Sequence, residues 1–298
     1  MAAARVATAR ARAVAVIEEL GINQLPVSPE AIAAARRIVL EERDGFPPQI
    51  FGAFEYARDG FKIYVSSACP TPGHRRFTIA HELGHYHLDG HLDALMAGTG
   101  AIKTSLSGHY RSRKDPLEVE ADAFASELLM PARLIRGVLG RVGRDVLGSA
   151  LRLAKQAATS RVAAAVRVVE MADALCAVVV SHEGAIEWMS CSPALWEYDF
   201  VRRPWRGEWA PRGSGALRLA HDPDAVVAGA SDGSTLLVCE WFDGAPETGK
   251  VEESSIGLGA YGRVLTVLFI PFLPDPDALY VRRQRIEDEE LRRKRSEG

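Results

Sequence analysis

Residues 75–88 read RRFTIAHELGHYHL, and this stretch contains the motif H-E-x-x-H. The two histidines of the motif, His81 and His85, are four positions apart. On an α-helix this spacing puts both imidazoles on one face, one turn apart, where they can reach the same metal ion. Apolar residues recur at helical spacing along the stretch and no proline interrupts them, so the sequence predicts a helix. Thr71 and Pro72 supply its expected start.

Glu82 follows the first histidine and therefore points to a neighbouring part of the same helix face. A carboxylate at this place can lie beside a metal without binding it and can take a proton from water. The alternative is a chance match, in which both histidines are merely solvated on an amphipathic surface helix. The motif is thus a hypothesis that requires a third ligand from elsewhere in the chain.

A catalytic zinc site uses three protein ligands and leaves the fourth position to water. Residues 116–131, PLEVEADAFASELLMP, predict a second helix with Asp115 as its N-cap and the final proline as its end. Glu118 is the predicted third ligand, and Asp122, one turn later, is predicted to orient a metal-binding histidine. Glu120 is the competing ligand, because only one of the two glutamates can face the metal. In the simplest alternative, all these acids are solvated surface charges.

Taken together, residues 76–85 and 118–131 resemble the ImmA/IrrE family of metallopeptidases. In that family the second helix typically reads E-x-E-A-N-x-F-A-x-x-L-L-M-P, so Asp122 replaces the usual Asn and restores the E-x-x-x-D pattern of the gluzincins. The resemblance implies a zincin-like, gluzincin-type site with the ligands His81, His85 and Glu118 and the general base Glu82. We expect Zn²⁺ as the cofactor, with Mn²⁺ as the alternative.

The resemblance also implies a substrate class. It is a helix-turn-helix repressor of the XRE type, whose cleavage switches on stress-response or mobile-element genes. Long-form members of the family add a helix-turn-helix segment and a GAF-like sensor domain, and this chain is long enough for both. The alternative function is a transcriptional regulator without proteolysis, which acts through its helix-turn-helix-like and sensor-like regions.

The predicted fold class is α+β, in three parts. Residues 1–140 are expected to form the peptidase domain, with a small antiparallel sheet that includes a hairpin at residues 49–56 and 60–66. Residues 141–174 are predicted to be helix-turn-helix-like, and residues 175–298 to be an α/β sensor-like domain of GAF type with a charged tail. The strands expected in this last domain are residues 175–181, 185–189, 236–241 and 263–269.

The middle segment has a weakly basic composition. Residues 141–173 contain six Lys and Arg against three Asp and Glu. Its expected recognition helix, residues 160–171, offers Arg161 and Arg167 but no Asn, Gln or Lys for base edges. DNA binding is therefore left open, and a helical hairpin that packs on the peptidase or docks a repressor is favoured.

Six histidines remain, and three of them, His87, His91 and His109, follow the motif closely or lie between the two predicted helices. Residues 89–114 are rich in Gly, Ser and Thr and predict a loop. In this loop, His109 and Tyr110 are candidates for stabilising the oxyanion that forms when water attacks a peptide carbonyl, against the alternative of ordinary exposed residues. His87 and His91 extend the histidine run and are predicted to be surface residues, not ligands.

Composition limits the classes of function. The 298 residues are 47% hydrophobic, which is enough to bury a sizeable core. The formal net charge of −3 argues against a protein that coats nucleic acid by bulk electrostatics. The four cysteines are far apart and read as buried thiols of a reducing cytosol. No run approaches the roughly 18 apolar residues of a membrane span, so a cytoplasmic protein is expected.

Overall fold

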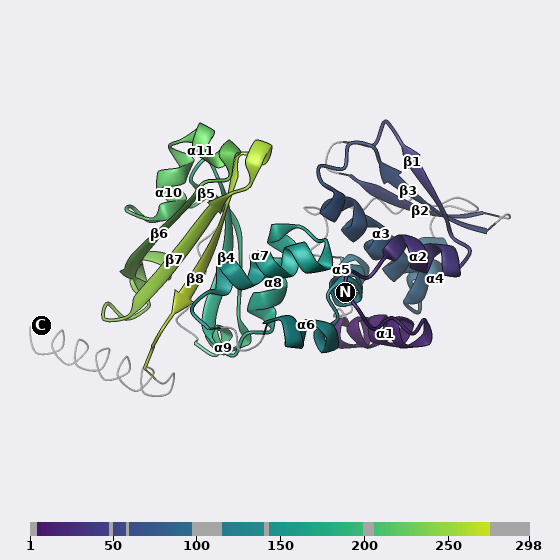
Figure 1. Cartoon of the computed structure of the whole chain (residues 1–298), viewed down its shortest axis with the longest axis horizontal. Helices are drawn as coiled ribbons and strands as arrows, with labels where there is room; N and C mark the ends of the chain where they lie inside the picture. The colour runs from purple at the N-terminus through teal and green to yellow at the C-terminus, as the bar shows by residue number, and fades with distance from the viewer. Residues whose placement is uncertain are drawn as a thin grey trace, which may run out of the picture. The chain divides into compact units, whose positions relative to one another are not determined.

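The computed structural model describes residues 5–47, 50–57, 60–96, 115–139, 143–198 and 206–274 (Figure 1). The chain divides into two compact units, of which the first is Met1–Gly140 with Ala150–Arg167 and the second is Arg141–Ser149 with Val168–Gly298. His109, Tyr110 and the charged tail lie outside the described residues. The three-part division expected from the sequence stays a prediction.

Two helices of the first unit begin where the sequence predicts them, at Pro72 and Pro116, whereas residues 91–96, expected to belong to a loop, are helical. The described helices are α1 (Val6–Glu19), α2 (Pro29–Ala35), α3 (Pro72–His87), α4 (His91–Met96), α5 (Pro116–Leu129) and α6 (Ala132–Leu139). The Thr71 hydroxyl accepts a hydrogen bond from the backbone N–H of His74 at 3.1 Å, and Asp115 accepts one from Leu117 at 3.0 Å. These caps satisfy backbone donors that a helix start leaves without partners, so they fix the first turns of α3 and α5.

The first unit contains a sheet of three described strands, β1 (Val39–Arg43), β2 (Gly52–Ala57) and β3 (Gly60–Ser66), in the order β1-β3-β2. Strands β2 and β3 form the predicted antiparallel hairpin. Strand β1 pairs with β3 in parallel, so the expectation of an antiparallel sheet is wrong and the sheet is mixed. The reason is topological: the chain reverses between β1 and β2 and again between β2 and β3, so β3 returns to the direction of β1.

Helix α3 packs on β2, β3 and α5. Helix α1 also packs on α5. Gly84 of α3 faces Ala121 of α5 so closely that an added Cβ would lie 3.1 Å from the Ala121 Cα. A side chain at position 84 would push the two helices apart. Glycine here therefore lets the H-E-x-x-H helix approach the helix that carries the acidic residues.

The segment called here the α7–α8 hairpin consists of α7 (Val146–Ala157) and α8 (Arg161–Glu170), joined by the expected three-residue turn. Its helix-turn-helix character stays a prediction. The turn packs against the start of α3, where a Cβ added to Gly73 would lie 2.6 Å from the Ser160 nitrogen. Arg167 of α8 is 2% exposed and pairs with Glu127 of α5. Of the two arginines that the expected recognition helix offers, Arg167 is therefore buried in the first unit, and DNA binding stays open.

The second unit is built on five described strands in the order β5-β4-β8-β7-β6, all antiparallel. They are β4 (Leu175–His182), β5 (Ala185–Cys191), β6 (Ser231–Leu237), β7 (Lys250–Gly257) and β8 (Arg263–Ile270). The helices are α9 (Pro193–Trp196), α10 (Gly215–Ala220), α11 (Pro223–Ala228) and α12 (Val238–Trp241), with the 3₁₀ turn η1 (Gly259–Tyr261). Helix α10 packs on β6, β7 and β8, as Figure 1 shows.

One strand expected in this unit is wrong. Residues 236–241 were expected to be extended, but β6 ends at Leu237 and α12 begins at Val238. The carboxylate of Glu240 accepts a hydrogen bond from the backbone N–H of Leu237 at 2.9 Å, which caps the new helix. A glutamate three residues into a helix start is a capping signal, and it competes with the strand preference of the apolar residues before it.

The other sequence expectations concern single residues. The four cysteines are free thiols, and Cys176 and Cys191 are buried as expected, whereas Cys69 and Cys239 are partly exposed. Among the described residues, no helix combines the length and the apolar character needed to cross a membrane.

Candidate metal centre

Three predicted ligands meet at the crossing of α3 and α5. The Nε2 atoms of His81 and His85 are 3.1 Å apart. One carboxylate oxygen of Glu118 lies 3.4 Å from the first of these nitrogens, and the other oxygen lies 3.4 Å from the second. Within the described ranges, this is the group of three potential ligands whose donor atoms all lie within 4.8 Å of one another.

These distances fit a single ion. Zinc binds imidazole nitrogen and carboxylate oxygen at about 2.0–2.2 Å in a tetrahedron, so neighbouring donor atoms should be roughly 3.3–3.5 Å apart. The separation of the two imidazole nitrogens and the distance from each nitrogen to its nearer Glu118 oxygen are close to this range, with a different carboxylate oxygen facing each imidazole. The donor set, two imidazoles and one carboxylate, is also one that zinc prefers. The residues present therefore fit a metal ion of this kind.

The electrostatics of the triad favour a cation. Burial alone would raise the pKa of Glu118, but hydrogen bonds from His81 and His85 hold the pKa of this carboxyl well below its usual range. Burial alone would lower the pKa of His81, but the carboxylates of Asp122 and Glu118 raise the pKa of this imidazole above its usual value. The two shifts report the same contacts from both sides, because the imidazoles stabilise the Glu118 carboxylate and the carboxylates stabilise a positive charge on His81.

Asp122 occupies the predicted place beside a ligand. Its Oδ1 atom lies 2.8 Å from Nδ1 of His81, on the side of the ring away from the triad. A carboxylate in this position accepts the Nδ1–H and leaves the Nε2 lone pair for a metal. The Asp122 side chain is 49% exposed and that of Glu118 is 14% exposed, whereas His85 is buried. Solvent therefore approaches the centre from the α5 side.

Glu82 is fully buried and lies against the first residue of β2. A Cβ added to Gly52 would be 2.8 Å from Oε1 of Glu82 and 2.3 Å from Cγ2 of Thr78. Position 52 therefore has to be glycine if Glu82 is to keep its place. Gly52 was not predicted as a site residue, because a single glycine at the start of a strand shows no sequence pattern that indicates such a role.

Gly52→Ala is expected to displace the Glu82 carboxylate without touching a ligand. Overpacking of this kind costs about 1–3 kcal/mol of stability, and a shift near 1 Å at a reacting group lowers a rate by roughly 100-fold. Zinc content should remain that of the wild type. The control is Gly137→Ala in α6, the same change where nothing lies within 4 Å of the new Cβ. Equal rates in the two variants would disprove the positioning role of Gly52.

The residues next to the triad correct two expectations. His91 is fully buried, with its Nδ1 3.0 Å from Nδ1 of His85, so its prediction as a surface residue is wrong. His87 is also buried, with its ring stacked on Phe124, so the same prediction is wrong there. The cause for His91 is the reversal at Gly90, which has a φ of 83° and returns the chain to α3 as α4 begins.

Glu120, the competing ligand, lies outside the triad. Its carboxylate pairs with Arg5 at 3.1 Å and lies 3.2 Å from Nε2 of His91. These contacts place it on the far side of His91 from the triad. The structure thus brings His81, His85 and Glu118 together, with Glu82 and Asp122 beside them, and it does not add Glu120.

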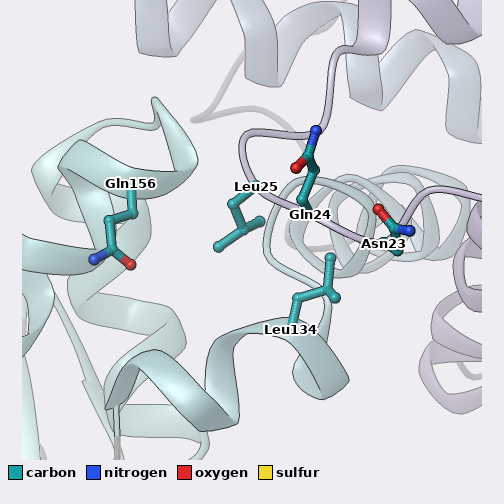
Figure 2. Close-up of a pocket in the computed structure, with 5 residues that line it drawn as sticks. All are labelled: Asn23, Gln24, Leu25, Leu134 and Gln156. Carbon is teal, nitrogen blue, oxygen red and sulfur yellow. The ribbon is translucent and has the colours of Figure 1, made fainter.

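The first unit also contains a cavity of about 320 Å³ that is not lined by the residues of the triad (Figure 2). Its lining residues are Asn23, Gln24, Leu25, Leu134 and Gln156. Figure 2 shows the loop of residues 23–25 facing Leu134 of α6, with Gln156 of α7 opposite. None of these side chains titrates or binds a catalytic metal strongly, so the metal triad remains the candidate site.

Fold and site together define an α+β domain with a candidate metal site on its H-E-x-x-H helix. Residues 47–169 match the family model described as Peptidase_M78, the IrrE N-terminal-like domain. This segment of the chain is an IrrE N-terminal-like domain, so the resemblance inferred from the sequence is confirmed. The matched family is one of peptidases by its description, and the matched residues include α3, α5 and α7.

A solved structure extends the likeness beyond this domain. The chain is similar to a Mycobacterium tuberculosis transcriptional regulator with a TM-score of 0.53 and 14% sequence identity. The alignment covers 89% of this chain and 88% of the regulator. At this identity the comparison shows a shared fold. A comparison with curated proteins gave no match.

Proposed function

We propose that the protein is a zinc-dependent endopeptidase that hydrolyses a peptide bond in a protein substrate. The observation that carries the proposal is the convergence of His81, His85 and Glu118 on one point, with Glu82 buried beside it. The match to a peptidase family supports it independently. The substrate class proposed is a helix-turn-helix repressor of the XRE type, which is met in the cytoplasm.

The chain's own residues would divide the work as follows. A zinc ion, when bound by the triad, acidifies a water molecule and polarises the substrate carbonyl. Glu82 would accept a proton from the attacking water at a carboxylate oxygen as the water oxygen adds to the carbonyl carbon. The same carboxyl then gives the proton to the amide nitrogen as the C–N bond breaks. Asp122 accepts the Nδ1–H of His81 and keeps that ring's Nε2 toward the triad.

The small sheet offers a place for an extended peptide. Strand β2 is at an edge of the three described strands, and its first residue, Gly52, touches the Glu82 side chain. A peptide that pairs with a free edge is held by main-chain hydrogen bonds and needs no fixed sequence. Pairing along β2 would carry a backbone carbonyl past Glu82, as an endopeptidase requires.

The direct test is incubation of the purified, zinc-loaded protein with XRE-type repressors, followed by mass spectrometry of the products. We expect discrete fragments from at least one repressor and none after chelation. Glu118→Ala should abolish both zinc uptake and cleavage, whereas Glu41→Ala, the same change at an exposed position of β1, should alter neither. Cleavage that persists in Glu118→Ala would refute the proposal. Loading with Mn²⁺ in parallel decides between the two metals.

The second candidate is a regulator that works without proteolysis. It is favoured by the fold shared over 89% of the chain with a protein described as a transcriptional regulator. In this case the α7–α8 hairpin and the second unit, a five-stranded sheet proposed to be sensor-like and of GAF type, would carry the activity. Specific duplex binding by a protein that binds zinc but cuts no repressor would support this candidate over the peptidase.

A further inference from the structure

A row of hydrogen bonds leads away from the metal triad through three buried side chains. Nδ1 of His85 lies 3.0 Å from Nδ1 of His91, and Nε2 of His91 lies 3.2 Å from Oε2 of Glu120. His91 is fully buried, and the Glu120 side chain is 4% exposed. These side chains come from α3, α4 and α5, so the row joins all three helices beside the candidate site.

The row ends at Arg5, immediately before α1. The backbone N–H of Arg5 donates to Oε1 of Glu120 at 2.9 Å, and its guanidinium donates to Oε2 at 3.1 Å. The same guanidinium donates to the backbone carbonyl of Asp89 at 2.9 Å, next to the turn that leads into α4. Arg5 lies outside the family match at residues 47–169, so the N-terminal segment of this chain adds a contact of its own.

The chemistry of these groups allows one arrangement of protons. Glu120 accepts hydrogen bonds from Arg5, so it is held as a carboxylate and must also accept from His91. His91 then carries its proton on Nε2, which leaves Nδ1 as an acceptor. That acceptor takes the Nδ1–H of His85. The Nε2 lone pair of His85 is therefore left toward His81 and Glu118, as a metal ligand requires.

We propose that Arg5, Glu120 and His91 form a positioning relay that fixes the tautomer and the ring orientation of the metal ligand His85. His91 is not itself a ligand, because both of its ring nitrogens have partners within the relay. Asp122 serves His81 directly, whereas His85 is served through a second imidazole. The inference rests on the proposed metal site and does not depend on the peptidase reaction.

The test compares zinc affinity, measured by chelator competition, in the full-length wild type and in variants of His91. His91→Leu removes the acceptor for Nδ1 of His85 and should weaken zinc binding roughly 10–100-fold. His91→Gln keeps an amide oxygen that accepts and an amide N–H₂ that donates, so it should recover most of the affinity. The matched control is His87→Leu, which removes a buried histidine outside the relay and should leave zinc affinity unchanged.

A second readout separates positioning from a general loss of structure. The visible spectrum of the Co²⁺-substituted protein reports the ligand geometry, and it should change in His91→Leu and return in His91→Gln. Arg5→Met alters an exposed end of the relay, so it should fold and still weaken zinc binding several-fold, even if His91→Leu does not fold. Affinity and spectrum unchanged in both His91→Leu and Arg5→Met would overturn the relay alone. A wild type that binds neither ion would overturn the metal site and the relay together.

Discussion

Glu82→Gln is expected to retain zinc and to lose proteolysis by a factor of roughly 10² to 10⁴, the usual contribution of a general acid–base. Glutamine has nearly the shape of glutamate, so it fits the space between α3 and Gly52 that the carboxylate occupies. Its amide cannot accept a proton from water at neutral pH. The ligands His81, His85 and Glu118 are untouched, so the change separates proton transfer from metal binding.

The measurement is the cleavage rate of a repressor at saturating concentration, together with the zinc content of each preparation. The control is Glu42→Gln, the same isosteric change on the exposed part of β1, which should cleave at the wild-type rate. Wild-type proteolysis in Glu82→Gln would remove the general-base assignment even if the metal site were correct. Loss of zinc in that variant would instead show that Glu82 is needed for the site to form.

The core of the site was predictable because its signals are local. The spacing of His81 and His85 specifies one helix face, and the caps Thr71 and Asp115 mark where α3 and α5 begin. The register of Glu118 and Asp122 on α5 then follows from helical geometry alone. A pattern that repeats within one element can be read without knowing what lies next to that element in space.

The surroundings of the site were not predictable because they depend on residues brought together by turns. His91 was expected at the surface, but the reversal at Gly90 returns it to α3, beside Glu120 and Arg5. Gly52 matters only because β2 lies against Glu82. Such contacts join positions that are far apart in the chain, and the residue pattern of neither segment predicts them.

The second unit shows a different limit. Strands β4 and β8 were expected from their apolar, β-branched runs and occupy the middle of the sheet. Strand β7 was missed, because residues 250–257 read KVEESSIG and look polar. In the structure Glu253 is buried and accepts hydrogen bonds from Ser234 and Ser255 at 2.8 and 2.9 Å. A polar strand whose side chains satisfy one another is stable in a sheet but gives no hydrophobic pattern.

Arg167→Met is expected to destabilise the first unit by about 3–5 kcal/mol, the cost of breaking a buried ion pair from one side. Arg167 of α8 is 2% exposed, pairs with Glu127 of α5, and donates from Nε to the Met130 carbonyl at 3.2 Å. Methionine would fill much of the space but leave the Glu127 carboxylate buried without its counter-charge. The measurement is urea unfolding followed by circular dichroism, with the midpoint and slope compared between proteins.

Two further variants make this expectation specific. The double variant Glu127→Gln, Arg167→Met removes the unpaired carboxylate charge and keeps an oxygen that accepts from the Ala132 N–H. It should therefore recover much of the stability that Arg167→Met loses. Arg161→Met, the same change on the exposed side of α8, should stay within about 0.5 kcal/mol of the wild type. If the hairpin also binds DNA, Arg161→Met should weaken that binding without loss of stability. A loss of unfolding free energy below about 1 kcal/mol in Arg167→Met would show that this ion pair does not hold α8 against α5.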